Sequence, residues 1–172
     1  HNKLPRLKQL WLAPFQLHKR FIEKINHIAQ AASEGVPGRI VAKMNALTDM
    51  ALIQALVHAG QQGVRIDLIV RGACMLPAQV PGHTDNIRVR SIIGRFLEHS
   101  RVFYFRSGAD EDLYLSSADW MNRNMMRRVE LAWPVRDPVQ RQRLIDECLV
   151  AGLFDDRDAW ILGADGCYTR AS

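Results

Sequence analysis

Apolar and polar residues alternate along this chain in two patterns that predict helices and strands by turns. Apolar positions spaced three and four residues apart predict helices over 15–34, 48–61, 91–97 and 138–154. Short apolar runs bounded by turn residues predict strands over 10–14, 39–44, 64–70, 87–90, 102–105, 113–115 and 129–134. Asp165-Gly166 lies between two further short apolar pairs and predicts a hairpin near the end of the chain.

The stretch 39–70 has the order strand, helix, strand. Two strands joined by a helix form a βαβ unit, in which the strands run parallel and the helix covers one face of the sheet. We expect Thr48 to cap this helix and Gly63 to end it. Residues 71–86 contain several Gly and Pro residues and predict a loop at the carboxyl end of a strand, which is the edge where open α/β sheets bind ligands.

Composition narrows the class of protein. The 172 residues are 48% apolar and 24% charged, which is typical of a globular domain and excludes disordered and fibrous classes. The net charge of +5 suits an anionic ligand, but it is not the dense basic surface of a dedicated nucleic-acid binder.

The three Cys residues are scattered along the chain, so we expect neither a disulfide framework nor a zinc site. We therefore expect the protein to work in the reducing cytoplasm. No apolar run is long enough to span a bilayer. The chain starts at His1 rather than Met, and we expect it to be a piece of a larger protein.

One short segment carries the residue types of a phosphate site. Residues 116–124 and 127–130 combine hydroxyls, amides, the carboxylate of Asp119 and several guanidiniums. Arg matches phosphoryl oxygens with a planar charged fork, and Ser and Asn add directional hydrogen bonds. Upstream, His99 lies close to Glu98 and Arg101, and spacing alone leaves two interpretations of His99 open. It is either a half-buried residue bonded to a loop carbonyl or a group that handles protons or phosphate.

Two further cations are expected at the ends of strands. Arg71 follows the strand 64–70 and precedes Gly72, and Lys43 lies near the end of the strand 39–44. If these strands are parallel, both cations lie at one edge, although a solvated Arg is the simpler interpretation of Arg71. Arg127 and Arg128 would face opposite sides of a strand, so at most one of them can serve the site.

These residues together resemble a known family. His99-Ser100-Arg101, followed by 116–124 and Glu130, resembles a phospholipase D type half-site. Longer stretches resemble the C-terminal part of bacterial polyphosphate kinase of the histidine-phosphorylating type; they are 43–49, 68–74, 85–89, 95–101, 114–121 and 165–170.

The resemblance implies a phospholipase D-like α/β domain, a mixed sheet flanked by helices, over 13–172, with residues 1–12 as a linker from a preceding domain. It implies an Mg²⁺-dependent enzyme that moves the terminal phosphate of ATP reversibly onto polyphosphate. In the family the phosphate passes through a phosphohistidine of the preceding domain, so we expect this fragment to be inactive alone. The resemblance further implies that the full-length enzyme binds ADP, contacts its preceding domains and forms a homo-oligomer. It implies no specific nucleic-acid partner. The expected location is the cytoplasm, and membrane association of the full-length enzyme stays open.

The resemblance also assigns roles to residues. Arg71 and His99 match positions that contact the nucleotide phosphates, and His99 would assist by hydrogen bonding or as a general acid. Lys43, Arg123 and Arg128 would line the phosphate tunnel, and no metal ligand is expected in this chain.

Two departures from the phospholipase D superfamily pattern leave alternatives open. Arg101 replaces the Lys of the phospholipase D motif, and Arg106 stands where an Asp is expected. Both changes put phosphodiester hydrolysis in doubt and suit a site that holds a polyanion. The alternatives are a phosphodiesterase or nuclease half that pairs with itself, and a noncatalytic module that binds polyanions through Arg71, Arg123 and Arg128.

Overall fold

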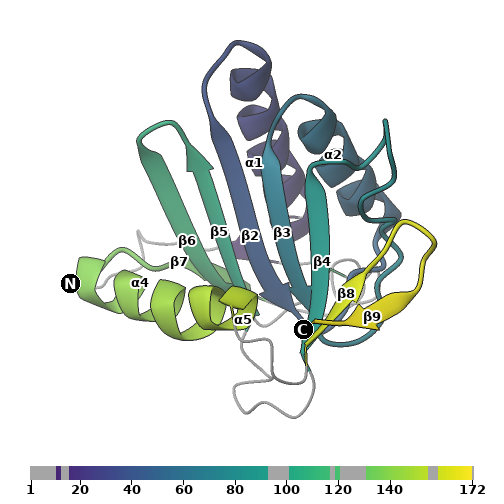
Figure 1. The fold of residues 1–172 in the computed structure, drawn as a ribbon. Helices are drawn as coiled ribbons and strands as arrows, with labels where there is room; N and C mark the ends of the chain where they lie inside the picture. Colours follow the sequence, from purple (N-terminus) through teal and green to yellow (C-terminus); the bar gives the residue numbers. More distant parts are fainter. Residues whose placement is uncertain are drawn as a thin grey trace.

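A single mixed sheet organises the part of the chain that the computed structural model describes, which is residues 11–12, 16–92, 101–116, 119–120, 131–154 and 159–171. Its nine strands are β1 (Trp11–Leu12), β2 (Gly38–Met44), β3 (Arg65–Val70), β4 (Ile87–Ile92), β5 (Arg101–Ser107), β6 (Asp110–Ser116), β7 (Leu131–Pro134), β8 (Ala159–Leu162) and β9 (Tyr168–Arg170). They lie in the order β1-β7-β6-β5-β2-β3-β4-β8-β9. Figure 1 shows β2, β3 and β4 near the centre.

Strand direction changes on either side of the centre. β2, β3 and β4 are parallel, as the predicted βαβ unit requires, and the strands outside them pair antiparallel. This confirms the mixed α/β fold class. Because β5 runs opposite to β2, it begins at the edge where β2, β3 and β4 end.

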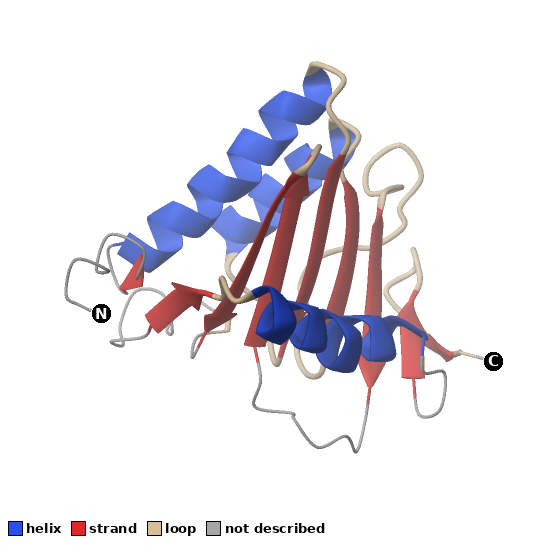
Figure 2. Cartoon of the chain, turned by 90° about the vertical axis from the view of Figure 1, so that its left-hand side faces the viewer, coloured by secondary structure: helices blue, strands red, loops and turns tan. Residues whose placement is uncertain are grey.

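Helices cover both faces of the sheet (Figure 2). α1 (Gln16–Ser33) and α2 (Met50–Gln61) lie on one face. The other face is crossed by one continuous helical run, composed of α4 (Pro138–Leu144), the π-helical η2 (Ile145–Val150) and α5 (Ala151–Phe154).

Side chains of β2 point alternately to the two faces of the sheet and so belong to two separate parts of the core. Ile40, Ala42 and Met44 belong to the larger cluster, which is packed against α1 and α2. Val41 faces the opposite way, into a smaller cluster with Leu149 of η2. Full burial of an aliphatic side chain such as Ile40 stabilises the fold by about 1.5–3 kcal/mol. The two-sided burial explains why β2 and β3 are mostly apolar, whereas β4 alternates apolar residues with the polar Arg88 and Arg90.

Two local predictions are wrong. Asp49, not Thr48, caps α2, because Asp49 has extended backbone and its Oδ1 accepts the Leu52 N–H at 2.9 Å. The helix predicted over 91–97 is wrong at Ser91 and Ile92, which continue β4 because they pair with Trp160 and Ala159 of β8. Residues 93–97 lie outside the described residues. The local sequence around Ser91 carries no sign of that distant partner. The predicted hairpin at Asp165-Gly166 is confirmed by the antiparallel pairing of β8 and β9.

Candidate functional site

The carboxyl ends of the parallel strands form the edge that the sequence pattern indicates as the binding edge. β2, β3 and β4 end at Met44, Val70 and Ile92, and β5 starts at the same edge with Arg101. Figure 1 shows these ends converging in the lower part of the molecule. Ligands of open α/β folds bind at such an edge because the loops that leave the strands can surround them.

Arg71 lies at this edge on a main chain that is held at three points. Its N–H donates to the Met44 carbonyl at 3.1 Å, and the N–H of Gly72 donates to the Asn45 carbonyl at 2.7 Å. Ser91 Oγ donates to the Arg71 carbonyl at 3.2 Å. The Arg71 residue itself is exposed. A rigid backbone that presents an exposed guanidinium suits contact with an anion.

Lys43 belongs to the same edge and borders the helical run of the second layer. Its register partner in β3 is Ile69, two residues before Arg71. Burial raises the pKa of the Cys148 thiol in η2, and the positive charge of Lys43 opposes that rise. Lys43 is half-buried and its charge acts on Cys148 of η2, whereas Arg71 is exposed.

The third feature of the edge is an ion pair between Arg101 and Asp119. Arg101 Nε donates to Asp119 Oδ1, and Arg101 Nη2 donates to Asp119 Oδ2, both at 3.2 Å. Asp119 Oδ1 also accepts the N–H of Asn45 at 2.7 Å. Asp119 is only 5% exposed, so this carboxylate is fully engaged inside the protein. Arg101 therefore shares its charge with an internal partner, which the sequence pattern did not indicate.

Trp120 anchors the segment that carries Asp119. Its ring is fully buried, stacks on Phe103 with centroids 4.8 Å apart and packs against Phe21 at 5.2 Å. Its carbonyl accepts the N–H groups of Thr48 and Asp49 at 2.8 and 2.9 Å. The aromatic packing thereby fixes the Asp119 segment against the loop between β2 and α2.

The described carboxylates at this edge, Asp49 and Asp119, do not fit a protein-held Mg²⁺. Asp119 is used by Arg101 and Asn45, and Asp49 is used by Leu52 and by the His18 ring, whose Nε2 lies 3.1 Å from Asp49 Oδ1. Mg²⁺ prefers several oxygen ligands in octahedral geometry. Across the described residues, no group of three His, Cys, Asp or Glu side chains could hold a metal ion.

The structure places only two of the predicted site residues, and their roles stay predictions. Lys43 and Arg71 lie at the same edge, because β2 and β3 are parallel. His99, Arg123 and Arg128 lie outside the described residues. The sequence pattern includes Asp119 in a polar segment but predicts no role for it. Its one sequence signal was a carboxylate among several guanidiniums, with no indication of which cation it would meet.

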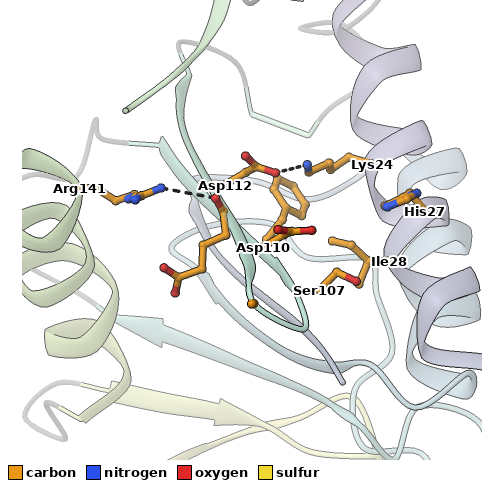
Figure 3. Close-up of a pocket in the computed structure, with 10 residues that line it drawn as sticks. Lys24, His27, Ile28, Ser107, Asp110, Asp112 and Arg141 are labelled. Atoms are coloured by element: carbon orange, nitrogen blue, oxygen red, sulfur yellow. Dashed lines mark hydrogen bonds and ion pairs between the residues drawn. The ribbon is translucent and has the colours of Figure 1, made fainter. Parts of the chain in front are cut away.

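A polar pocket of about 440 Å³ lies at the opposite edge of the sheet, beside the turn from β5 to β6 (Figure 3). Lys24 is paired with Asp112, and Arg141 Nη1 donates to the Glu111 carbonyl at 3.4 Å. These two cations therefore already have acceptors within the protein. The pocket is separate from the edge formed by Lys43 and Arg71.

Comparison with known proteins shows the family of the chain. The family model Polyphosphate kinase C-terminal domain 2 matches residues 10–172. The chain belongs to the polyphosphate kinase family. A polyphosphate kinase of Burkholderia cenocepacia is 53% identical over 164 residues, which are 95% of this chain and 24% of the relative. The chain therefore spans about a quarter of the length of such relatives.

Solved structures agree with the polyphosphate kinase assignment and with the fold. The crystal structure of polyphosphate kinase from Porphyromonas gingivalis superposes with a TM-score of 0.88 at 36% identity, and the match covers 94% of this chain and 25% of that one. Nuc, a phospholipase D family member from Salmonella typhimurium, has a TM-score of 0.56 at 14% identity, covering 81% of this chain and 89% of its own. The second match shows a shared phospholipase D-like fold. No described helix is both long and apolar enough to cross a membrane.

Proposed function

We propose that this chain is the C-terminal catalytic domain of a longer polyphosphate kinase that transfers the terminal phosphate of ATP reversibly to polyphosphate. The observation that supports the proposal is that Lys43 and Arg71 both lie at the carboxyl edge of the parallel strands, Lys43 in β2 and Arg71 directly after β3. The family match over residues 10–172 adds the reaction class. Because the chain spans about a quarter of its relatives, the remaining domains would complete the site.

In the proposed reaction the bond between the terminal phosphorus of ATP and its bridging oxygen breaks, and ADP leaves. A bond from phosphorus to a histidine nitrogen of another domain forms. That P–N bond then breaks as an oxygen at the end of polyphosphate bonds to the phosphorus, and the histidine is released for the next transfer. Arg71 would stabilise the charge that develops on the phosphoryl oxygens. His99 would act as an auxiliary group, by hydrogen bonding to the phosphoryl group or by protonating the leaving group.

The other cations would guide the polyanion. Lys43, Arg123 and Arg128 are proposed to line a tunnel for polyphosphate, where several charges spread along the path hold the chain without a single tight site. Mg²⁺ would arrive as the ion of the nucleotide substrate, because the described carboxylates of this edge are engaged by protein donors. We further propose contacts with the preceding domains, a homo-oligomeric full-length enzyme and a cytoplasmic location.

The test compares Arg71→Ala with Arg65→Ala in the full-length enzyme. Arg65 lies at the amino end of the same strand, β3, and is also exposed, so it is a matched control at the opposite edge. We expect Arg71→Ala to lower kcat for polyphosphate synthesis by roughly 100-fold, because a donor to the developing charge is lost. Arg65→Ala is expected to leave kcat and KM unchanged.

Both directions of transfer are measured, together with binding of ATP by calorimetry. If Arg71→Ala and Arg65→Ala have the same kinetic constants, Arg71 does not belong to the phosphate site. Metal-independent cleavage of a phosphodiester by this chain would instead favour the phosphodiesterase alternative.

A further inference from the structure

The carboxylate of Asp119 connects two segments that approach the phosphate edge from different strands. Oδ1 and Oδ2 together hold the guanidinium of Arg101 at the start of β5, and Oδ1 also holds the N–H of Asn45 just after β2. We propose that Asp119 is a positioning residue, which sets the placement of the β5 start relative to the turn that carries Arg71. The inference rests on the proposed function of this edge.

On one side, the ion pair fixes orientation as well as distance. Two parallel N–H···O bonds of 3.2 Å place the guanidinium and carboxylate planes together, which a single bond could not do. The side chain of Arg101 is 20% exposed and that of Asp119 is 7% exposed, so water competes little for either group. Arg101 is the first residue of β5, so its placement fixes where the strand begins. It follows His99 by two residues in the sequence.

On the other side, the contact continues through the main chain to Arg71. Asn45 donates its N–H to Asp119 and accepts the N–H of Gly72 through its own carbonyl, each at 2.7 Å. The two bonds hold the planar peptide units on either side of the Asn45 Cα, so both ends of this residue are fixed. A Cβ built on Gly72 would lie 2.8 Å from the Asn45 oxygen, so the turn is packed without spare room. A shift of Asp119 would therefore move the backbone that presents Arg71.

A carboxylate is needed here because only an ionised acceptor can serve all three donors. Asn at position 119 could still accept the Asn45 N–H through its amide oxygen. Its NH₂ group would face a guanidinium that has only donors, and the ion pair would be lost. Asp119→Asn thus keeps the size and the main-chain bond while removing the alignment of Arg101.

The test is Asp119→Asn in the full-length enzyme, with Asp67→Asn as the matched control. Asp67 is also paired with an Arg of the same sheet, Arg39, but it lies four residues before Arg71 in the middle of β3. We expect Asp119→Asn to lower kcat by roughly 10- to 100-fold, since small misplacements of reacting groups cost that much. Asp67→Asn is expected to lower the melting temperature and leave kcat and KM unchanged.

Two further variants separate positioning from general loss of structure. Arg101→Lys keeps the charge but cannot form the two parallel bonds, so we expect a lower kcat with a melting temperature near that of the wild type. In an Arg101→Met background, Asp119→Asn is expected to change kcat less than about threefold, because its partner is already gone. An undiminished effect in that background would contradict the inference.

Arg71→Ala is measured in the same assay, so that failure of the positioning role can be told apart from failure of the proposed function. If Arg71→Ala lowers kcat while Asp119→Asn matches Asp67→Asn, the positioning role is wrong and the proposed function stands. If Arg71→Ala leaves catalysis intact, the phosphate edge itself is misplaced, whatever Asp119→Asn does.

Discussion

Close packing at Gly72 holds together the backbone of the phosphate edge. A Cβ there would lie 2.8 Å from the carbonyl oxygen of Asn45, a backbone atom that cannot rotate away. The same oxygen accepts the Gly72 N–H at 2.7 Å. The missing side chain lets the end of β3 approach the end of β2, and this approach places Arg71 beside the Asp119 network.

At this residue scale we expect Gly72→Ala to lower the free energy of unfolding by about 1–3 kcal/mol, the usual cost of inserting an atom into a filled space. Gly152→Ala in α5 is the comparison. There the new Cβ would meet Ile69 Cδ1, the end of a flexible side chain, and Ala also favours the helix. Urea unfolding of both variants measures the difference. Equal losses would show that the Asn45 contact does not constrain the turn.

The beginning of α2 joins several elements of the fold. Asp49 caps the helix through the Leu52 N–H and contacts His18 of α1. The backbone N–H groups of Thr48 and Asp49 donate to Trp120. One short loop therefore connects both helices of the first layer with the segment that carries Asp119.

At the element scale we expect Asp49→Ala to lower the free energy of unfolding by about 1–2 kcal/mol, because the first turn of α2 loses its side-chain acceptor. Thr48→Ala leaves that cap in place and is expected to cost less. Chemical denaturation measures the stabilities, and amide hydrogen exchange at Leu52 reports the cap directly. A larger cost for Thr48→Ala would restore Thr48 as the cap.

The whole molecule separates two edges with different chemistry. Lys43, Arg71 and the Arg101–Asp119 pair lie at the carboxyl edge of the parallel strands, and the pocket of Figure 3 lies at the other. Between these edges, Tyr104 and Tyr114 are buried in β5 and β6. Burial is the main cause that raises the pKa of Tyr104 to about 12, and the hydrogen bond and negative charge of Glu111 add to the rise. Arg106 acts in the opposite direction and lowers the pKa. Burial and Asp112 likewise raise the pKa of Tyr114 to about 12.

At the whole-molecule scale these shifts predict loss of stability in alkali. The unfolded tyrosines lose their protons near pH 10, whereas the folded ones keep theirs to about pH 12. The folded state therefore binds more protons in this window, and its stability falls as pH rises through it. We expect Tyr104→Phe and Tyr114→Phe together to flatten that fall in urea unfolding. An unchanged slope between about pH 10 and about pH 12 would contradict the assignment.

Particular residues show how far local pattern could predict the site. The placement of Arg71 and Lys43 at one edge is predictable, because strand ends and the βαβ rule are visible in nearby sequence. The β8 partner of Ser91 and the capping role of Asp49 were missed, because competing local signals favoured a helix and Thr48. The π-helical turn at Ile145–Val150 was also missed, since its apolar spacing is that of an ordinary helix.

The sequence by itself determined the alternation of strands and helices, the parallel centre and the family motifs, because these depend on spacings within a few dozen residues. Only the tertiary structure decided that Asp119 meets both Arg101 and Asn45. Asn45 and Asp119 are 74 positions apart, and the contact depends on how Trp120 packs against Phe21 and Phe103. Such a contact arises from the packing of whole elements, which short-range patterns do not record.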